Sequence, residues 1–96
     1  MRLHQINKAN YSSSIERDII YSIAPSDKVL LIEDAIIRLM NKSDPLLNLI
    51  HQKKIDMYAL ESDLKAYGAV LPTYITPITD LEWVALTSEC NHHIAW

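Results

Sequence analysis

Two pairs of acidic residues are the first candidates for chemistry in this sequence. Glu33 ends one predicted strand and Asp34 directly follows it, and Glu61 and Asp63 follow the next strand. Carboxylates that meet at strand ends can bind a metal ion or accept a phosphoryl group. A phosphoacceptor site also needs further acids and a partner lysine at other strand ends, and no such set is evident. We therefore favour the structural interpretation, in which these acids interact with the dipole of a helix start.

Cys90 is the one thiol of the chain and the second candidate. A reactive cysteine needs partial exposure and a pKa lowered by a helix N-terminus or a nearby cation. Cys90 instead lies near the C-terminal end of a predicted helix, where the dipole disfavours a thiolate. His92 would offer only a weak partner from an extended segment. A small buried hydrophobic side chain is the favoured role, and a persulfide carrier is the alternative.

A zinc site around Cys90, His92 and His93 is not expected. Adjacent residues in a strand point to opposite faces, and no second group of ligands stands at zinc spacing. The single glycine of the chain excludes the glycine-rich phosphate loops of nucleotide-binding proteins. We therefore predict neither a metal nor a cofactor.

Two tryptophans suggest binding rather than catalysis. Trp83 lies on the last predicted helix, and Trp96 ends the apolar segment 94–96. Tryptophan is enriched at the energetic centres of protein interfaces. Each ring either anchors a partner or packs onto its own domain, and the sequence leaves both options open.

Length and composition fit one small domain, residues 1–96, with 49% hydrophobic and 22% charged residues. The net charge of −3 argues against direct nucleic-acid binding. The longest strongly apolar run, 29–32, is far shorter than the roughly 20 residues of a membrane span. The N-terminus lacks the apolar segment of a secretory signal. We expect a cytoplasmic protein without membrane contact.

Short apolar segments alternate with helical patterns along the chain. The predicted strands are 2–6, 29–33, 55–60, 74–78 and 92–96. Helices are expected to begin at capping signals, which are Ser13 with Glu16, Asp44 with Pro45, Ser62, and Thr79 with Glu82. A further helical pattern follows Asp34, and Gly68 is suited to end a helix. This alternation predicts a small doubly wound α/β domain, mainly parallel, with helices on both faces of the sheet.

Four segments together resemble the DsrH/TusB family. In chain order they are RLHQINK at 2–8, VLLIEDAI at 29–36, MYALESDLKAYG at 57–68 and LTSECNHHIAW at 86–96. The resemblance implies a DsrE/DsrH-like fold and a TusB-like place in a TusBCD-type sulfur-relay heterohexamer. The implied partners are a DsrE/TusD-like and a DsrF/TusC-like paralogue, with a TusE/DsrC-like protein accepting the sulfur. The implied product is the 2-thiolated wobble uridine of tRNA.

The resemblance also implies that this subunit is not itself an enzyme. The family's catalytic paralogue carries a persulfide cysteine near the end of its third strand, where this chain has Leu60, Glu61 and Ser62. Carboxylates there would repel an incoming thiolate. Ala35 departs from the glycine that relatives often have. The first predicted helix lacks the cysteine of some DsrH-type sequences, which favours the tRNA role.

Three alternatives remain at this stage. The first is a DsrH-type subunit in dissimilatory sulfur oxidation, and the second is a persulfide carrier that uses Cys90. The third is an unrelated, stand-alone homo-oligomeric α/β protein, which the small core and Trp96 would suit.

Overall fold

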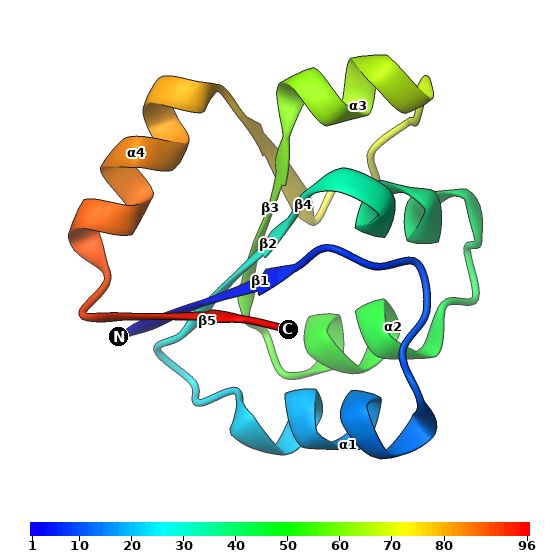
Figure 1. Cartoon of the computed structure of the whole chain (residues 1–96). Coiled ribbons are helices and arrows are strands. Elements are labelled where there is room, and N and C mark those ends of the chain that lie inside the picture. Colours follow the sequence, from blue (N-terminus) through cyan, green and yellow to red (C-terminus); the bar gives the residue numbers. More distant parts are fainter.

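The computed structural model describes all residues, 1–96, and has an α/β fold (Figure 1). Five strands alternate with helices, as the sequence predicts, and each strand agrees with its predicted bounds to within two residues. The elements in chain order are β1 (Arg2–Ile6), α1 (Ser13–Ser22), β2 (Lys28–Leu31), the 3₁₀ helix η1 (Glu33–Met40), α2 (Pro45–Gln52), β3 (Asp56–Leu60), α3 (Glu61–Tyr67), β4 (Ile75–Ile78), α4 (Asp80–Glu89) and β5 (His92–Ala95).

The five strands form a single sheet in the order β4-β3-β2-β1-β5, and every neighbouring pair is parallel. The doubly wound fold is therefore confirmed, and the sheet is wholly rather than mainly parallel. Helix α4 carries the chain from β4 at one edge to β5 at the other. The backbone N–H of Trp96 donates to the Gln5 carbonyl at 3.0 Å, which joins the end of the chain to β1. No helix is both long and apolar enough to cross a bilayer.

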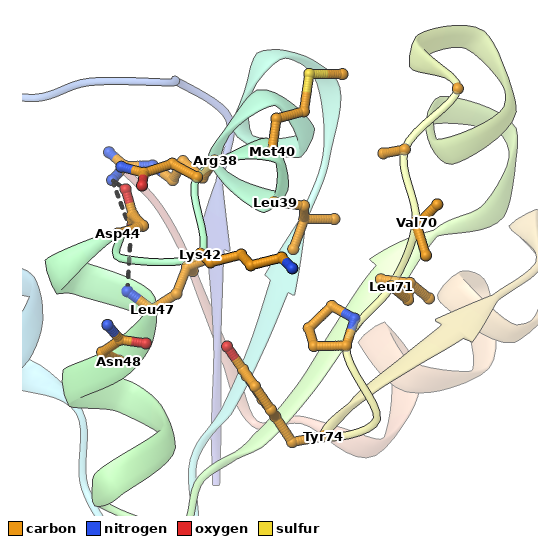
Figure 2. Close-up of a pocket in the computed structure, with 14 residues that line it drawn as sticks. Arg38, Leu39, Met40, Lys42, Asp44, Leu47, Asn48, Val70, Leu71 and Tyr74 are labelled. Carbon is orange, nitrogen blue, oxygen red and sulfur yellow. Dashed lines mark hydrogen bonds and ion pairs between the residues drawn. The ribbon is translucent and has the colours of Figure 1, made fainter.

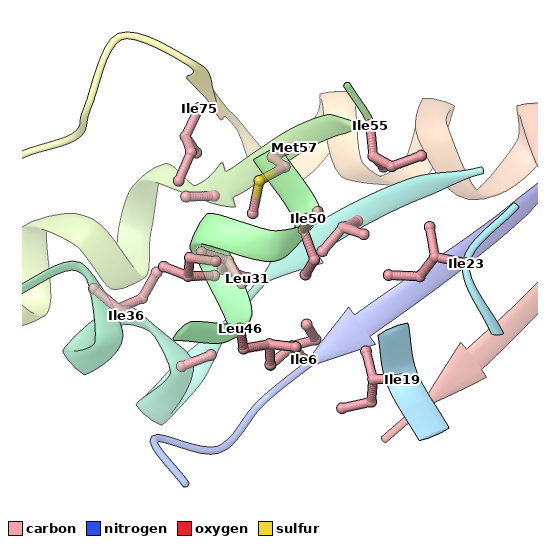
Figure 3. Close-up of a cluster of buried hydrophobic side chains, with 14 of the residues drawn as sticks. Ile6, Ile19, Ile23, Leu31, Ile36, Leu46, Ile50, Ile55, Met57 and Ile75 are labelled. Atoms are coloured by element: carbon pink, nitrogen blue, oxygen red, sulfur yellow. The ribbon is translucent and has the colours of Figure 1, made fainter. Parts of the chain in front are cut away.

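The two faces of the sheet are covered unequally. Helices α1, η1, α2 and α3 contribute to a core of fifteen buried residues on one face (Figure 3). The core of the other face has seven buried residues, and α4 is the one helix above it. Its members are Leu3, Leu30, Ile32, Leu60, Ile78, Leu86 and Cys90. Strand β2 is enclosed on both sides, since Val29, Leu30 and Leu31 are fully buried. A continuous aliphatic run is typical of such a strand.

Two of the predicted helix starts are confirmed. The Asp44 carboxylate accepts a hydrogen bond from the Leu47 amide at 3.0 Å, and Pro45 occupies the first helical position of α2. Thr79 and Glu82 form the reciprocal capping box of α4, with bonds of 3.2 and 2.9 Å. Each satisfies backbone N–H groups that have no partner within the helix.

The other two predicted caps are wrong. Helix α1 is capped by Ser12, whose hydroxyl accepts from the Ile15 amide at 3.3 Å, and not by Ser13. Any serine of the run 12–14 can serve as a cap, so sequence alone does not fix the register. Helix α3 begins one residue before Ser62 and has no side-chain cap, because the chain enters it directly from the buried end of β3.

Residues 33–40 form a 3₁₀ helix rather than an α-helix. Its period of three places Ala35 and Arg38 on the same side, and both are buried. Ile37 and Met40, which are apolar, remain 40% and 59% exposed. The tighter winding thus turns a charged side chain toward the interior.

Candidate functional site

The predicted acidic residues gather at the carboxyl edge of the sheet. Strands β2 and β3 are neighbours, so Glu33, Asp34, Glu61 and Asp63 follow strand ends that lie side by side. Asp63 Oδ2 accepts a hydrogen bond from the Glu33 amide at 2.7 Å, and Asp34 Oδ1 accepts one from the Tyr67 hydroxyl.

These contacts fasten η1 to α3. The Asp63 carboxylate holds the amide of Glu33, a residue whose φ of +52° lies in the left-handed region. The hydrogen bond to Asp34 raises the pKa of the Tyr67 hydroxyl. The chain contains no group of three or more His, Cys, Asp and Glu side chains arranged to hold a metal ion. The acidic cluster therefore has a structural role, because its hydrogen bonds hold η1 against α3.

The end of β3 carries no sulfur. Leu60 is buried, Glu61 lies 3.1 Å from the exposed Lys65 amine, and Ser62 is exposed in the first turn of α3. The end of β3 therefore offers no thiolate that could act as the nucleophile in a sulfur transfer.

Cys90 lies near the amino ends of the strands, between the end of α4 and the start of β5. Its N–H donates to the Leu86 carbonyl at 3.3 Å, and its side chain belongs to the smaller core. Burial raises the pKa of the Cys90 thiol and outweighs the opposing effect of the Lys28 cation. No hydrogen bond joins it to His92, which is exposed. The structure thus encloses a protonated thiol.

Cys90 is accordingly expected to resist alkylation. At pH 8 the native protein should react with iodoacetamide at least about tenfold more slowly than the urea-unfolded chain, because the thiol is both covered and protonated. Mass spectrometry over time gives both rates. Equal rates for the folded and unfolded chain would show an accessible thiolate and contradict this account.

The Trp96 ring is held by a buried histidine. It lies nearly parallel to the His4 ring, with ring centroids 6.2 Å apart and an interplanar angle of 9°, and its Nε1 donates to His4 Nδ1 at 3.2 Å. An indole N–H can only donate, so Nδ1 must accept and the ring proton of a neutral His4 resides on Nε2. That nitrogen lies 2.9 Å from Asp27 Oδ2. The tautomer is thus assigned by its two neighbours.

Asp27 is the centre of this network. Its carboxylate accepts from the Arg2 amide at 3.0 Å, the Arg2 Nε at 3.1 Å and the Ala24 amide at 3.0 Å, in addition to His4. Burial alone would raise the pKa of Asp27, but the bonds from Ala24, His4 and Arg2 together hold it far below its usual range. No local pattern relates positions 2, 4 and 27 to Trp96, so the sequence predicts none of these partners of the Trp96 ring.

Trp83 points inward from α4 and packs against the smaller core. Its Nε1 is buried and has no hydrogen-bond partner. Both tryptophans are half-buried within their own domain, so only a part of each ring is left for a partner. Their role as interface anchors stays a prediction.

A cavity of about 630 Å³ lies between the end of η1, the start of α2 and the loop 68–74 (Figure 2). The Lys42 amine extends into it between apolar walls that include Leu39 and Leu71, whereas the Arg38 guanidinium turns aside to Asp44. The ionisable side chains that line this cavity are Arg38, Lys42, Asp44 and Tyr74. The Asp44 carboxylate already accepts hydrogen bonds from Arg38 and from the Leu47 amide.

Fold and site define a small, wholly parallel α/β domain whose strand ends carry acids and no nucleophilic sulfur. The family model for DsrH like protein matches residues 8–93, and the chain therefore belongs to the DsrH-like family. The crystal structure of ychN protein from E. coli is similar, with a TM-score of 0.76 at 15% identity over 99% of this chain and 97% of that one. This likeness shows a shared fold. No curated protein matches the sequence.

Proposed function

We propose that this chain is a non-catalytic subunit of a sulfur-relay complex that supplies persulfide sulfur for 2-thiolation of tRNA wobble uridine. One observation carries the proposal in a member of the DsrH-like family: the end of β3 presents Leu60, Glu61 and Ser62 instead of a thiol. The proposed partners are DsrE/TusD-like and DsrF/TusC-like paralogues in a cytoplasmic heterohexamer, which delivers sulfur to a TusE/DsrC-like acceptor.

The position of Cys90 supports a non-catalytic role. All strands are parallel, so their amino ends lie on one side of the sheet and their carboxyl ends on the other. Cys90 precedes β5 and lies at the amino ends, whereas Glu61 follows β3 and lies at the carboxyl ends. A sulfur bound at Cys90 would be enclosed and separated by the length of a strand from the edge on which the proposed relay operates. The acidic balance fits a subunit that binds proteins and leaves the tRNA to a later enzyme.

The role is tested by complementation. Cells that lack this gene are expected to lose 2-thiouridine from their tRNA, and both the wild-type gene and Cys90→Ser should restore it. Mass spectrometry of digested tRNA measures the modified nucleoside. Failure of Cys90→Ser alone to restore it would favour a persulfide on Cys90. Unchanged thiolation in cells that instead lose sulfur oxidation would favour the dissimilatory pathway.

A further inference from the structure

The outer face of α4 is apolar and uncovered. Leu81 and Val84 are 83% and 62% exposed, and Ala85 and Ser88 are exposed beside them. The spacing 81, 84, 85, 88 places these four on one side of the helix, and we call them the α4 stripe. Leu86 and Trp83 point inward from the same helix and pack in the smaller core. Helix α4 is thus apolar on both sides.

The hydroxyl protons on and beside the stripe are used within the helix. Ser88 Oγ donates to the Val84 carbonyl at 3.2 Å, and Thr87 Oγ1 donates to the same oxygen at 2.7 Å. Both hydroxyls are therefore bonded to the backbone of their own helix, and the small residues Ala85 and Ser88 leave a flat surface. Such a surface lets another backbone approach closely.

Nothing in this chain covers the stripe. Helix α4 is the one helix on its face of the sheet and stands apart from the other helices (Figure 1). Its inward side already supplies the contacts that the smaller core needs. Adjacent exposed apolar residues on an element that is packed on its other side are typical of a protein-binding surface.

The charges beside the stripe identify the kind of partner. Helix α4 carries Asp80, Glu82 and Glu89 and no lysine or arginine. Lys28 lies 3.8 Å from Glu89, but it is mostly covered, and the other two acids have no cationic partner. Two copies of α4 packed together would oppose acid to acid, which disfavours a homodimer.

We propose that the α4 stripe binds a subunit of different sequence, whose contact surface is apolar and flanked by lysine or arginine. This inference rests on the proposed function in one respect: the expected partner is another subunit of the relay. A basic rim on that partner would neutralise Asp80 and Glu82 while its apolar centre covers Leu81 and Val84.

Site-specific cross-linking tests the surface directly. A photoreactive benzoylphenylalanine replaces Val84 in the full chain, expressed in cells together with the DsrE-like and DsrF-like paralogues. Met40, which is 59% exposed on η1, receives the same group as a control. We expect position 84 to cross-link a different chain at a peptide that contains lysine or arginine, with little product from position 40. Cross-links to a second copy of this chain, or none above the control, would overturn the inference.

A matched pair of charge variants gives the energetic test. Val84→Asp places a charge at the proposed contact and should weaken the complex at least about tenfold, whereas Met40→Asp should not. Both positions are exposed, so both variants are expected to fold. Circular dichroism verifies this. If the paralogues bind Val84→Asp as tightly as wild type, the α4 inference fails and the proposed function stands. A cross-link from position 84 to a protein unlike either paralogue would support the α4 stripe as a binding surface and contradict the proposed function.

Discussion

Asp44→Ala is expected to destabilise the domain by about 3–5 kcal/mol, because it leaves a buried guanidinium without its nearest anion. The Arg38 side chain is 2% exposed, and its Nη1 lies 3.3 Å from Asp44 Oδ1 (Figure 2). The same nitrogen lies 3.7 Å from Glu16 Oε1. Its Nη2 is buried without any partner. If Asp44 is removed, the more distant Glu16 is therefore the one carboxylate left beside the Arg38 guanidinium.

Three variants separate the charge of Asp44 from its capping role. Asp44→Asn keeps an oxygen for the Leu47 amide and loses only the charge, since asparagine caps helices as well as aspartate. Arg38→Met with Asp44→Ala removes both charges and should be more stable than Asp44→Ala alone. Asp18→Ala, at an exposed position of α1, should stay within about 0.5 kcal/mol of wild type.

Urea and thermal unfolding measure these differences. A loss of 3 kcal/mol in a domain of this size lowers Tm by at least about 12 °C. The account of the Arg38–Asp44 pair is contradicted if Asp44→Asn is as stable as wild type. It is also contradicted if the double variant is less stable than Asp44→Ala alone.

Asp27→Asn is expected to have the second largest effect, about 3 kcal/mol or more. The carboxylate accepts from His4, Arg2 and two backbone amides, and an asparagine amide group would direct N–H bonds against some of these donors. The network joins β1 to the turn before β2 and positions Trp96 through His4. Its loss should therefore loosen the attachment of β5 as well.

The effect of Asp27→Asn should depend on pH in one direction. Folding lowers the pKa of Asp27, so its contribution is fully present above the pKa of the unfolded chain and falls as pH drops toward the folded pKa. The difference in free energy of unfolding between wild type and Asp27→Asn should thus be constant near pH 7. It should shrink by about 1.4 kcal/mol per pH unit below about pH 4. Asp56→Asn, at an exposed acid on β3, is the control, and a difference that does not change with pH would contradict the ionised network.

Much of the fold follows from short-range patterns. The aliphatic run at Val29 predicts a strand buried on both faces, and the capping box of Thr79 with Glu82 predicts the start of α4, because both depend only on neighbouring residues. A mainly parallel sheet follows from the alternation of strands and helices, whereas the structure adds that every neighbouring pair of strands is parallel. The absence of a thiol after β3 is likewise visible in the sequence, and it carries the proposed function.

The remaining features depend on contacts between distant residues. His4, Asp27 and Trp96 meet only because α4 carries the chain across the sheet and sets β5 beside β1. Arg38 is buried because residues 33–40 adopt a 3₁₀ winding, which no local propensity predicts. The outward side of α4 could not be told from its inward side, since both are apolar. Tertiary packing decides each of these cases.

The central claim is that this chain is one part of a sulfur-relay assembly, and the mass of the co-expressed complex tests it most directly. The chain and its DsrE-like and DsrF-like paralogues are produced together, purified through a tag on this chain, and measured by native mass spectrometry. We predict one species that contains all three different chains in equal numbers. A tagged chain that appears alone, as a monomer or homo-oligomer, while the paralogues assemble without it would contradict the account.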